Sequence, residues 1–81
     1  MRVRVKLFAV ARELAGSNEV VVELRDGATV DDLRTELTSL VPALGRIMPH
    51  SLWAIGTEYV GGDAVLPDDA DVALIPPVSG G

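Results

Sequence analysis

The stretch DVALIPPVSGG, residues 71–81, decides both the architecture that the sequence predicts and the place where its chemistry is expected. In residues 71–75, Val72 and Leu74 point to one side of an extended chain, and Ala73 and Ile75 point to the other. A short run that is apolar on both faces is typical of a strand in the middle of a sheet. We therefore expect a sheet whose last strand in the sequence is central in space.

The two prolines after this strand predict a boundary, because neither can donate a ladder hydrogen bond and each restricts the backbone. Pro76 and Pro77 divide the chain into a domain over residues 1–75 and an extended tail over residues 76–81. Six extended residues reach at most about 20 Å, far enough to carry a terminal carboxyl group into the pocket of another protein. An incidental, frayed end is the alternative interpretation of the same tail.

The last two residues, Gly80 and Gly81, suit covalent chemistry at the terminal carboxyl group. Glycine has no Cβ, so it fits a narrow channel and leaves the carboxyl carbon open to attack. Adenylation by a partner that uses ATP would activate this carbon. A sulfur nucleophile could then displace AMP and leave a thiocarboxylate, which would let a chain with no cysteine carry sulfur.

The segments before the last strand supply one main helix and four further strands. Residues 2–8 and 19–24 alternate between apolar and polar positions, which predicts two half-buried strands joined by a short helical turn. A helix is expected to begin after Thr29, with Asp32 completing a capping box, and to stop at Pro42. An irregular stretch then leads to Ser51, and short strands are expected at residues 52–55 and 58–60.

Composition narrows the classes of protein to which the chain can belong. Its 81 residues allow one domain, and 48% hydrophobic residues are enough for one core. A net charge of −5 argues against nucleic-acid binding, which needs a basic surface. No apolar stretch approaches the length of a membrane span. We expect a soluble, cytoplasmic protein that binds no nucleic acid and no membrane.

Single side chains give weaker signals. Phe8 shares a strand face with Arg4 and Lys6 if the alternation is strict, so it either forms part of a docking surface or bends into the core. Trp53, on an apolar strand, is expected in the core. His50 has no second histidine at ligand spacing, so we interpret it as a solvated loop residue rather than a metal ligand.

In these residues the chain resembles the family of molybdopterin synthase small subunits (MoaD). The members of that family are ubiquitin-like sulfur carriers. The resemblance covers the whole chain and rests on KLFAVARELAGS (6–17), TVDDLRTEL (29–37), EYV (58–60) and above all DVALIPPVSGG (71–81). It implies an α+β, β-grasp fold in which a mixed sheet packs on one main helix. Gly56 stands where the family commonly has asparagine, so any side-chain role of that asparagine would be missing here.

The resemblance also implies roles for named residues. Gly81, preceded by Gly80, would be adenylated by a ubiquitin-activating-type enzyme that uses ATP, converted to a thiocarboxylate, and inserted into the large subunit of the synthase. There its sulfur would pass to cyclic pyranopterin monophosphate to build the dithiolene of molybdopterin. Two small subunits would flank a dimer of large ones in a heterotetramer. Contacts with the partner are expected from Phe8, Tyr59, Ile75, Pro76, Pro77, Val78 and Ser79.

The catalytic pocket would belong to the large subunit, so this chain is expected to bind no cofactor and no metal and to be only the sulfur-donor subunit of a sulfurtransferase. Ile75 could instead belong to the core, as the two-sided strand favours. Three alternatives remain open for the function: a carrier for another thiolation pathway, a ubiquitin-like protein modifier joined to lysines through Gly81, and a binding module with an incidental terminus.

Overall fold

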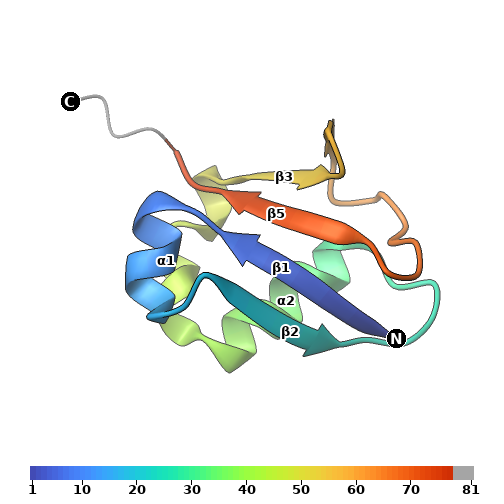
Figure 1. Cartoon of the computed structure of the whole chain (residues 1–81), viewed down its shortest axis with the longest axis horizontal. Helices are drawn as coiled ribbons and strands as arrows, with labels where there is room; N and C mark the ends of the chain where they lie inside the picture. Colours follow the sequence, from blue (N-terminus) through green and yellow to red (C-terminus); the bar gives the residue numbers. More distant parts are fainter. Residues whose placement is uncertain (78–81) are drawn as a thin grey trace.

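Five strands form one mixed sheet in the computed structural model, which describes residues 1–77 (Figure 1). In sheet order the strands are β2-β1-β5-β3-β4. β1 and β5 run parallel, and the other neighbouring pairs are antiparallel. The prediction of a central last strand is therefore confirmed, as is the α+β, β-grasp class. The strands are β1 (Arg2–Leu7), β2 (Glu19–Glu23), β3 (Leu52–Ile55), β4 (Glu58–Val60) and β5 (Asp71–Ile75).

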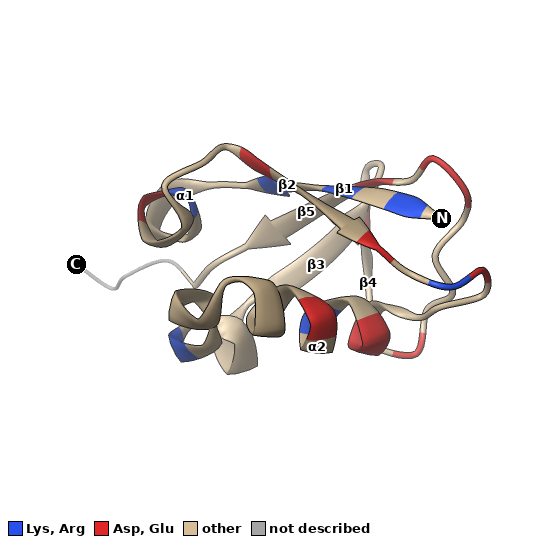
Figure 2. Ribbon diagram, turned by 90° about the horizontal axis from the view of Figure 1, so that it is seen from below, with Lys and Arg blue, Asp and Glu red and all other residues tan. Residues whose placement is uncertain are grey.

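The long helix α2 (Val30–Leu40) packs on one side of the sheet, and Figure 2 shows it below the strands. Its inward stripe of Val30, Leu33 and Leu37 is fully buried. Leu40, which could have extended the stripe, is 54% exposed, and Val41 takes its place against the core. This stripe meets the inward face of the sheet, where Val5 and Val72 are also fully buried.

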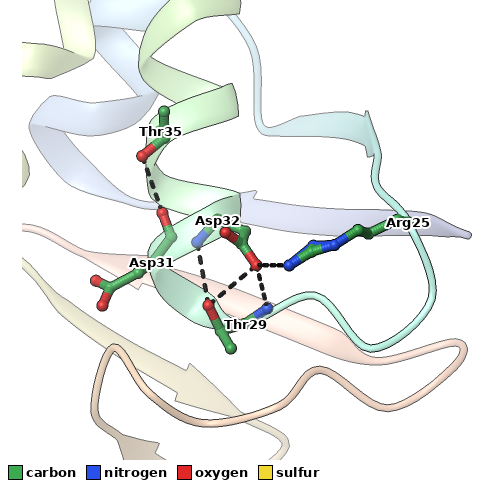
Figure 3. A network of polar contacts seen from close by, with 5 residues as sticks. All are labelled: Arg25, Thr29, Asp31, Asp32 and Thr35. Carbon is green, nitrogen blue, oxygen red and sulfur yellow. Dashed lines mark hydrogen bonds and ion pairs between the residues drawn. The ribbon is translucent and has the colours of Figure 1, made fainter.

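A capping box fixes the start of α2, as the sequence predicts (Figure 3). The backbone N–H of Thr29 donates to the Asp32 carboxylate at 2.9 Å, and the backbone N–H of Asp32 donates to the Thr29 hydroxyl oxygen at 3.3 Å. Arg25 adds an ion pair to the same carboxylate at 3.2 Å. The Thr29 N–H is the largest cause that lowers the pKa of Asp32, and the Thr29 hydroxyl and Arg25 act in the same direction against partial desolvation.

The other helical segments are short. α1 (Ala9–Ala15) joins β1 to β2 and ends at Gly16, whose φ of 70° is left-handed. The expectation of an irregular stretch before Ser51 is wrong, because two 3-10 helices, η1 (Pro42–Arg46) and η2 (Met48–His50), occupy it. A proline stands in the first turn of each, where its missing N–H leaves no hydrogen bond unmade.

The remaining expectations about single residues are also resolved. Trp53 is 6% exposed and belongs to the core cluster, as predicted. His50 is exposed but lies in η2 rather than in a loop. Gly56 turns the chain between β3 and β4 at a φ of 62°, and a Cβ there would meet nothing within 4 Å. Asparagine tolerates this backbone region, so glycine in its place leaves the turn unchanged.

Candidate functional site

One face of the sheet carries no helix in the described part of the chain, and we call it the open face. The inward residues of β1 are buried, so its alternate residues Arg2, Arg4 and Lys6 point to the open face. Register extends this assignment from strand to strand, because paired residues share a face. The open face thus comprises Arg2, Arg4, Lys6, Glu19, Val21, Glu23, Leu52, Ala54, Tyr59, Asp71, Ala73 and Ile75.

One half of the open face is apolar, and we define the apolar patch as Phe8, Leu52, Ala54, Tyr59, Ala73 and Ile75. Leu52 pairs with Ile75, and Ala54 pairs with both Ala73 and Tyr59. Ala54 is only 7% exposed although it is outside the core cluster, because the larger side chains around it shield it from solvent. Leu52 and Tyr59 are 56% and 67% exposed. Such a contiguous exposed apolar surface marks an interaction site in a soluble domain.

Phe8 reaches the apolar patch because β1 ends beside β5. Leu7 pairs with Leu74, and Phe8 follows with an extended backbone at φ −123° and ψ 155°. The alternation of the strand therefore continues by one residue and places Phe8 on the open face, one position beyond the last pair of β1 with β5. Its side chain is 48% exposed. Of the two interpretations offered by the sequence, a core position is excluded for Phe8 and a surface position is observed.

Ile75 also lies on the surface side of the sheet. It is half-buried, and it is neither in the core cluster nor among the side chains packed against that cluster. The interpretation of Ile75 as a core residue is therefore wrong. A central strand such as β5 has a paired strand on each side, but helices cover only one face of this sheet. Ile75 lies on the other face, so the central position of its strand does not bury it.

The other half of the open face is a ladder of charges. Arg2 forms an ion pair with Glu23 at 3.3 Å, Arg4 stands between Val21 and Asp71, and Lys6 stands opposite Glu19. A shallow depression of about 510 Å³ opens here, lined by Arg2, Arg4, Glu19, Val21, Asp69, Ala70 and Asp71. Two basic and three acidic side chains line the depression, so its charges nearly cancel and it offers no strong attraction to a charged ligand.

The two prolines after β5 differ in their environment. Pro76 is buried and Pro77 is exposed. Pro76 thus packs against the domain. Of the two prolines that were predicted to contact a partner, only Pro77 is exposed in the isolated chain. Val78, Ser79, Gly80 and Gly81 lie outside the described residues, so their predicted roles stay predictions.

The patch contains residues that the sequence did not single out. Leu52, Ala54 and Ala73 join Phe8, Tyr59 and Ile75 only because β3 pairs with β5 in one particular register. The sequence shows that residues 52–55 are all apolar, but for that reason it does not show which face of the sheet each residue takes. Across residues 1–77, no group of three acidic, histidine or cysteine side chains is arranged to hold a metal ion, and no helix could span a membrane.

Comparison with known proteins connects this geometry to a family. The profile of the ThiS family matches residues 5–81. A molybdopterin synthase sulfur carrier subunit from Chlamydomonas reinhardtii is 42% identical over 83 residues, which cover the whole of both chains. Small archaeal modifier protein 1 from Haloferax volcanii is 38% identical over 94% of this chain and 97% of that protein. A crystal structure of the same Haloferax protein superposes with a TM-score of 0.89, at 32% identity and full coverage of both chains.

Proposed function

This chain belongs to the ThiS family, and on that basis we propose that it is the sulfur carrier subunit of a molybdopterin synthase. The observation that carries the proposal is the similarity to the Chlamydomonas relative, which is 42% identical over the full length of both chains. That relative is named a molybdopterin synthase sulfur carrier subunit. The chain lies in the cytoplasm in this proposal, and its partners are the large subunit and an adenylating enzyme.

The chemistry proposed for the chain takes place at one carbon. The Gly81 carboxylate attacks the α-phosphorus of ATP in the adenylating partner, and pyrophosphate leaves. Sulfide supplied by a sulfur donor then attacks the acyl adenylate, AMP leaves, and a thiocarboxylate remains. The thiocarboxylate is a better nucleophile than a carboxylate, so in the pocket of the large subunit its sulfur bonds to a carbon of cyclic pyranopterin monophosphate and displaces an oxygen group. Water then cleaves the bond between this sulfur and the Gly81 carbonyl carbon, which restores the carboxylate.

The apolar patch supports the proposal, because a carrier of this kind must bind partners that load and unload it. Phe8, Leu52 and Tyr59 expose 48%, 56% and 67% of their surface on a face with no helix of its own. The patch includes the last residue of β5, Ile75, from which the chain continues into the tail. A partner that binds the patch is therefore placed where the tail leaves the domain.

Complementation tests the role of the tail. In cells that lack their own small subunit, the full chain should restore molybdoenzyme activity, and a chain without Gly81 should not. A matched control is Leu40→Ala, which changes an exposed residue outside the patch and should restore activity fully. Equal amounts of each soluble variant must be verified by immunoblot. Activity from the chain that lacks Gly81 would contradict the proposal.

The Haloferax relative, which is named a protein modifier, favours one second candidate. In that case the activated Gly81 would be transferred to lysine amines of other proteins. Incubation of the tagged chain with ATP and extract separates the two functions. A modifier would give a ladder of conjugates that resist reducing agent, whereas a carrier would remain a single band.

A further inference from the structure

The backbone is strained at Ala9, directly beside the apolar patch. Ala9 has a φ of 48°, in the left-handed region that a residue with a Cβ rarely adopts. Among the described residues other than glycine, only Asp69 also has a positive φ. Aspartate tolerates this region because its short polar side chain can form a local hydrogen bond, a compensation that alanine lacks. Strain of this kind persists only where the surrounding structure imposes it, and it clusters at functional positions.

The residues on both sides of Ala9 impose its conformation. Leu7 is 2% exposed, and its backbone N–H donates to the carbonyl of Asn18 at 2.8 Å. Ala11 is fully buried, and its backbone N–H donates to the carbonyl of Phe8 at 3.0 Å. The chain must therefore pass from strand β1 into helix α1 within the three exposed residues 8–10, and Ala9 is the middle one (Figure 1).

The side chain of Ala9 does nothing to offset this strain, because its methyl group is exposed and fills no space in the core. At the other end of α1, the left-handed position is occupied by Gly16, which has no Cβ to clash. The left-handed residue at the start of the same helix is an alanine. What the turn at Ala9 supports is the preceding residue, Phe8, whose extended backbone places its half-exposed ring on the open face.

We propose that Ala9 is a positioning residue, whose left-handed turn holds Phe8 on the open face for docking. The proposal rests on the proposed function in that the docking partner is the large subunit. If Ala9 took an ordinary negative φ, the direction of the chain would change at this point. Leu7 and Ala11 are fixed in the core, so the exposed Phe8 would absorb the change and lose its place on the open face.

The residue at position 9 should therefore set both the stability of the turn and the place of Phe8. Glycine adopts a positive φ without a steric cost, so Ala9→Gly should raise the melting temperature by a few degrees and leave Phe8 in place. Valine is β-branched, and a positive φ is an outlier for it, so Ala9→Val should lower the melting temperature and displace Phe8. Ala43 provides matched controls, because it is exposed in η1 and its φ is not positive. Ala43→Gly should lower the melting temperature, and Ala43→Val should leave Phe8 in place.

Fluorine NMR can follow Phe8 by itself, because Phe8 is the only phenylalanine in the chain and a fluorinated phenylalanine labels no other position. The fluorine resonance reports the surroundings of the ring, and its shift between light and heavy water reports how exposed the ring is. Both quantities should agree in the wild-type chain, in Ala9→Gly and in the two Ala43 variants, and both should change in Ala9→Val. Proton NMR of the wild-type chain should show the short distance between amide proton and Hα that marks a left-handed residue at Ala9.

Docking provides the second measurement, by calorimetric titration with the large subunit. The exposed 48% of the Phe8 side chain is roughly 70–120 Å², so Phe8→Ala should raise the Kd about tenfold. Ala9→Val should raise it by a similar factor, whereas Ala9→Gly should bind within about threefold of the wild-type chain. In a chain that already carries Phe8→Ala, Ala9→Val should cause no further loss, because no ring remains to be positioned. A general structural defect would instead add to the effect of Phe8→Ala.

Several results would overturn the proposal. They are a melting temperature that falls equally in Ala9→Gly and Ala43→Gly, an unchanged Phe8 resonance in folded Ala9→Val, and a loss of affinity that adds to that of Phe8→Ala. A negative φ at Ala9 or a shielded Phe8 ring in the wild-type chain would overturn it even if Ala9→Val did not fold. If the wild-type chain does not bind the large subunit, the proposed function fails, and the melting temperatures and the fluorine resonance still decide whether Ala9 holds Phe8.

Discussion

Replacing Tyr59 with alanine should weaken the binding of the large subunit while leaving the domain folded. Tyr59 lies on the edge strand β4 and is the most exposed large side chain of the apolar patch, at 67%. Because so little of it is buried in the isolated chain, its removal should change the free energy of unfolding by less than about 0.5 kcal/mol. Its contribution is therefore to a complex rather than to the fold.

The size of the effect follows from the exposed area. A tyrosine side chain offers about 150–250 Å² for burial, so the exposed two-thirds amounts to roughly 100–170 Å². At about 25 cal/mol per Å², complete burial would contribute about 2.5–4 kcal/mol. The hydroxyl remains solvated and alanine retains part of the area, so we expect a loss of about 2 kcal/mol, or roughly 30-fold in Kd.

Isothermal titration of the purified chain with its large subunit measures this change. Val65→Ala is the matched control, because Val65 is 63% exposed but lies outside the patch. It should bind within about threefold of the wild-type chain, less than 1 kcal/mol. Equal loss of affinity in both variants, or no loss in Tyr59→Ala at an unchanged melting temperature, would refute the assignment of the patch as the docking surface.

Three further substitutions and one control test the fold beneath the site. Thr29→Ala removes the N-cap of α2 and should destabilise the chain by about 1 kcal/mol, a fall in Tm of roughly 4–8 °C in calorimetry. Asp32→Asn should make the free energy of unfolding depend less on pH in the acidic range. The folded pKa of Asp32 lies below its unfolded value of about 3.9, so its stabilisation is complete above that value and is lost as the pH falls through the folded pKa. Urea unfolding measures the free energy of unfolding of the wild-type chain and of Asp32→Asn between about pH 6 and pH 2. A constant difference between the two chains over this range would contradict the reasoning. Leu37→Ala should cost about 3 kcal/mol in the core, whereas Leu40→Ala, at an exposed position of the same helix, should cost less than about 1 kcal/mol, and equal urea midpoints would contradict the assigned helix face.

Local patterns were enough to predict most of the fold. The capping box of Thr29 and Asp32 is a sequence-local device, and it was found where the pattern placed it. The central position of β5 was also predicted, because its residues are apolar on both faces. One of these faces packs on the core, and the other forms part of the apolar patch. Pro42 ended the helical pattern, but that a proline can also begin a 3-10 turn was overlooked.

The site was less predictable, because it depends on register and on the ends of strands. Phe8 is exposed because β1 keeps its alternation for one residue beyond its last pair, which the sequence left open. Leu52 was missed because only its pairing with Ile75 assigns it to the open face. Pro76 is buried for a tertiary reason, since nothing in a Pro-Pro pair distinguishes the ring that packs on the domain from the ring that is exposed.

The most direct test of the proposed function is the mass of the chain after loading and after unloading. Incubation with the adenylating enzyme, ATP and a sulfur donor should replace one oxygen by sulfur, and fragmentation should locate that change at Gly81. Addition of the large subunit and cyclic pyranopterin monophosphate should return the mass to its starting value as molybdopterin forms. A chain that never gains sulfur, or that gains it and keeps it while the product accumulates, would contradict a role as the sulfur donor.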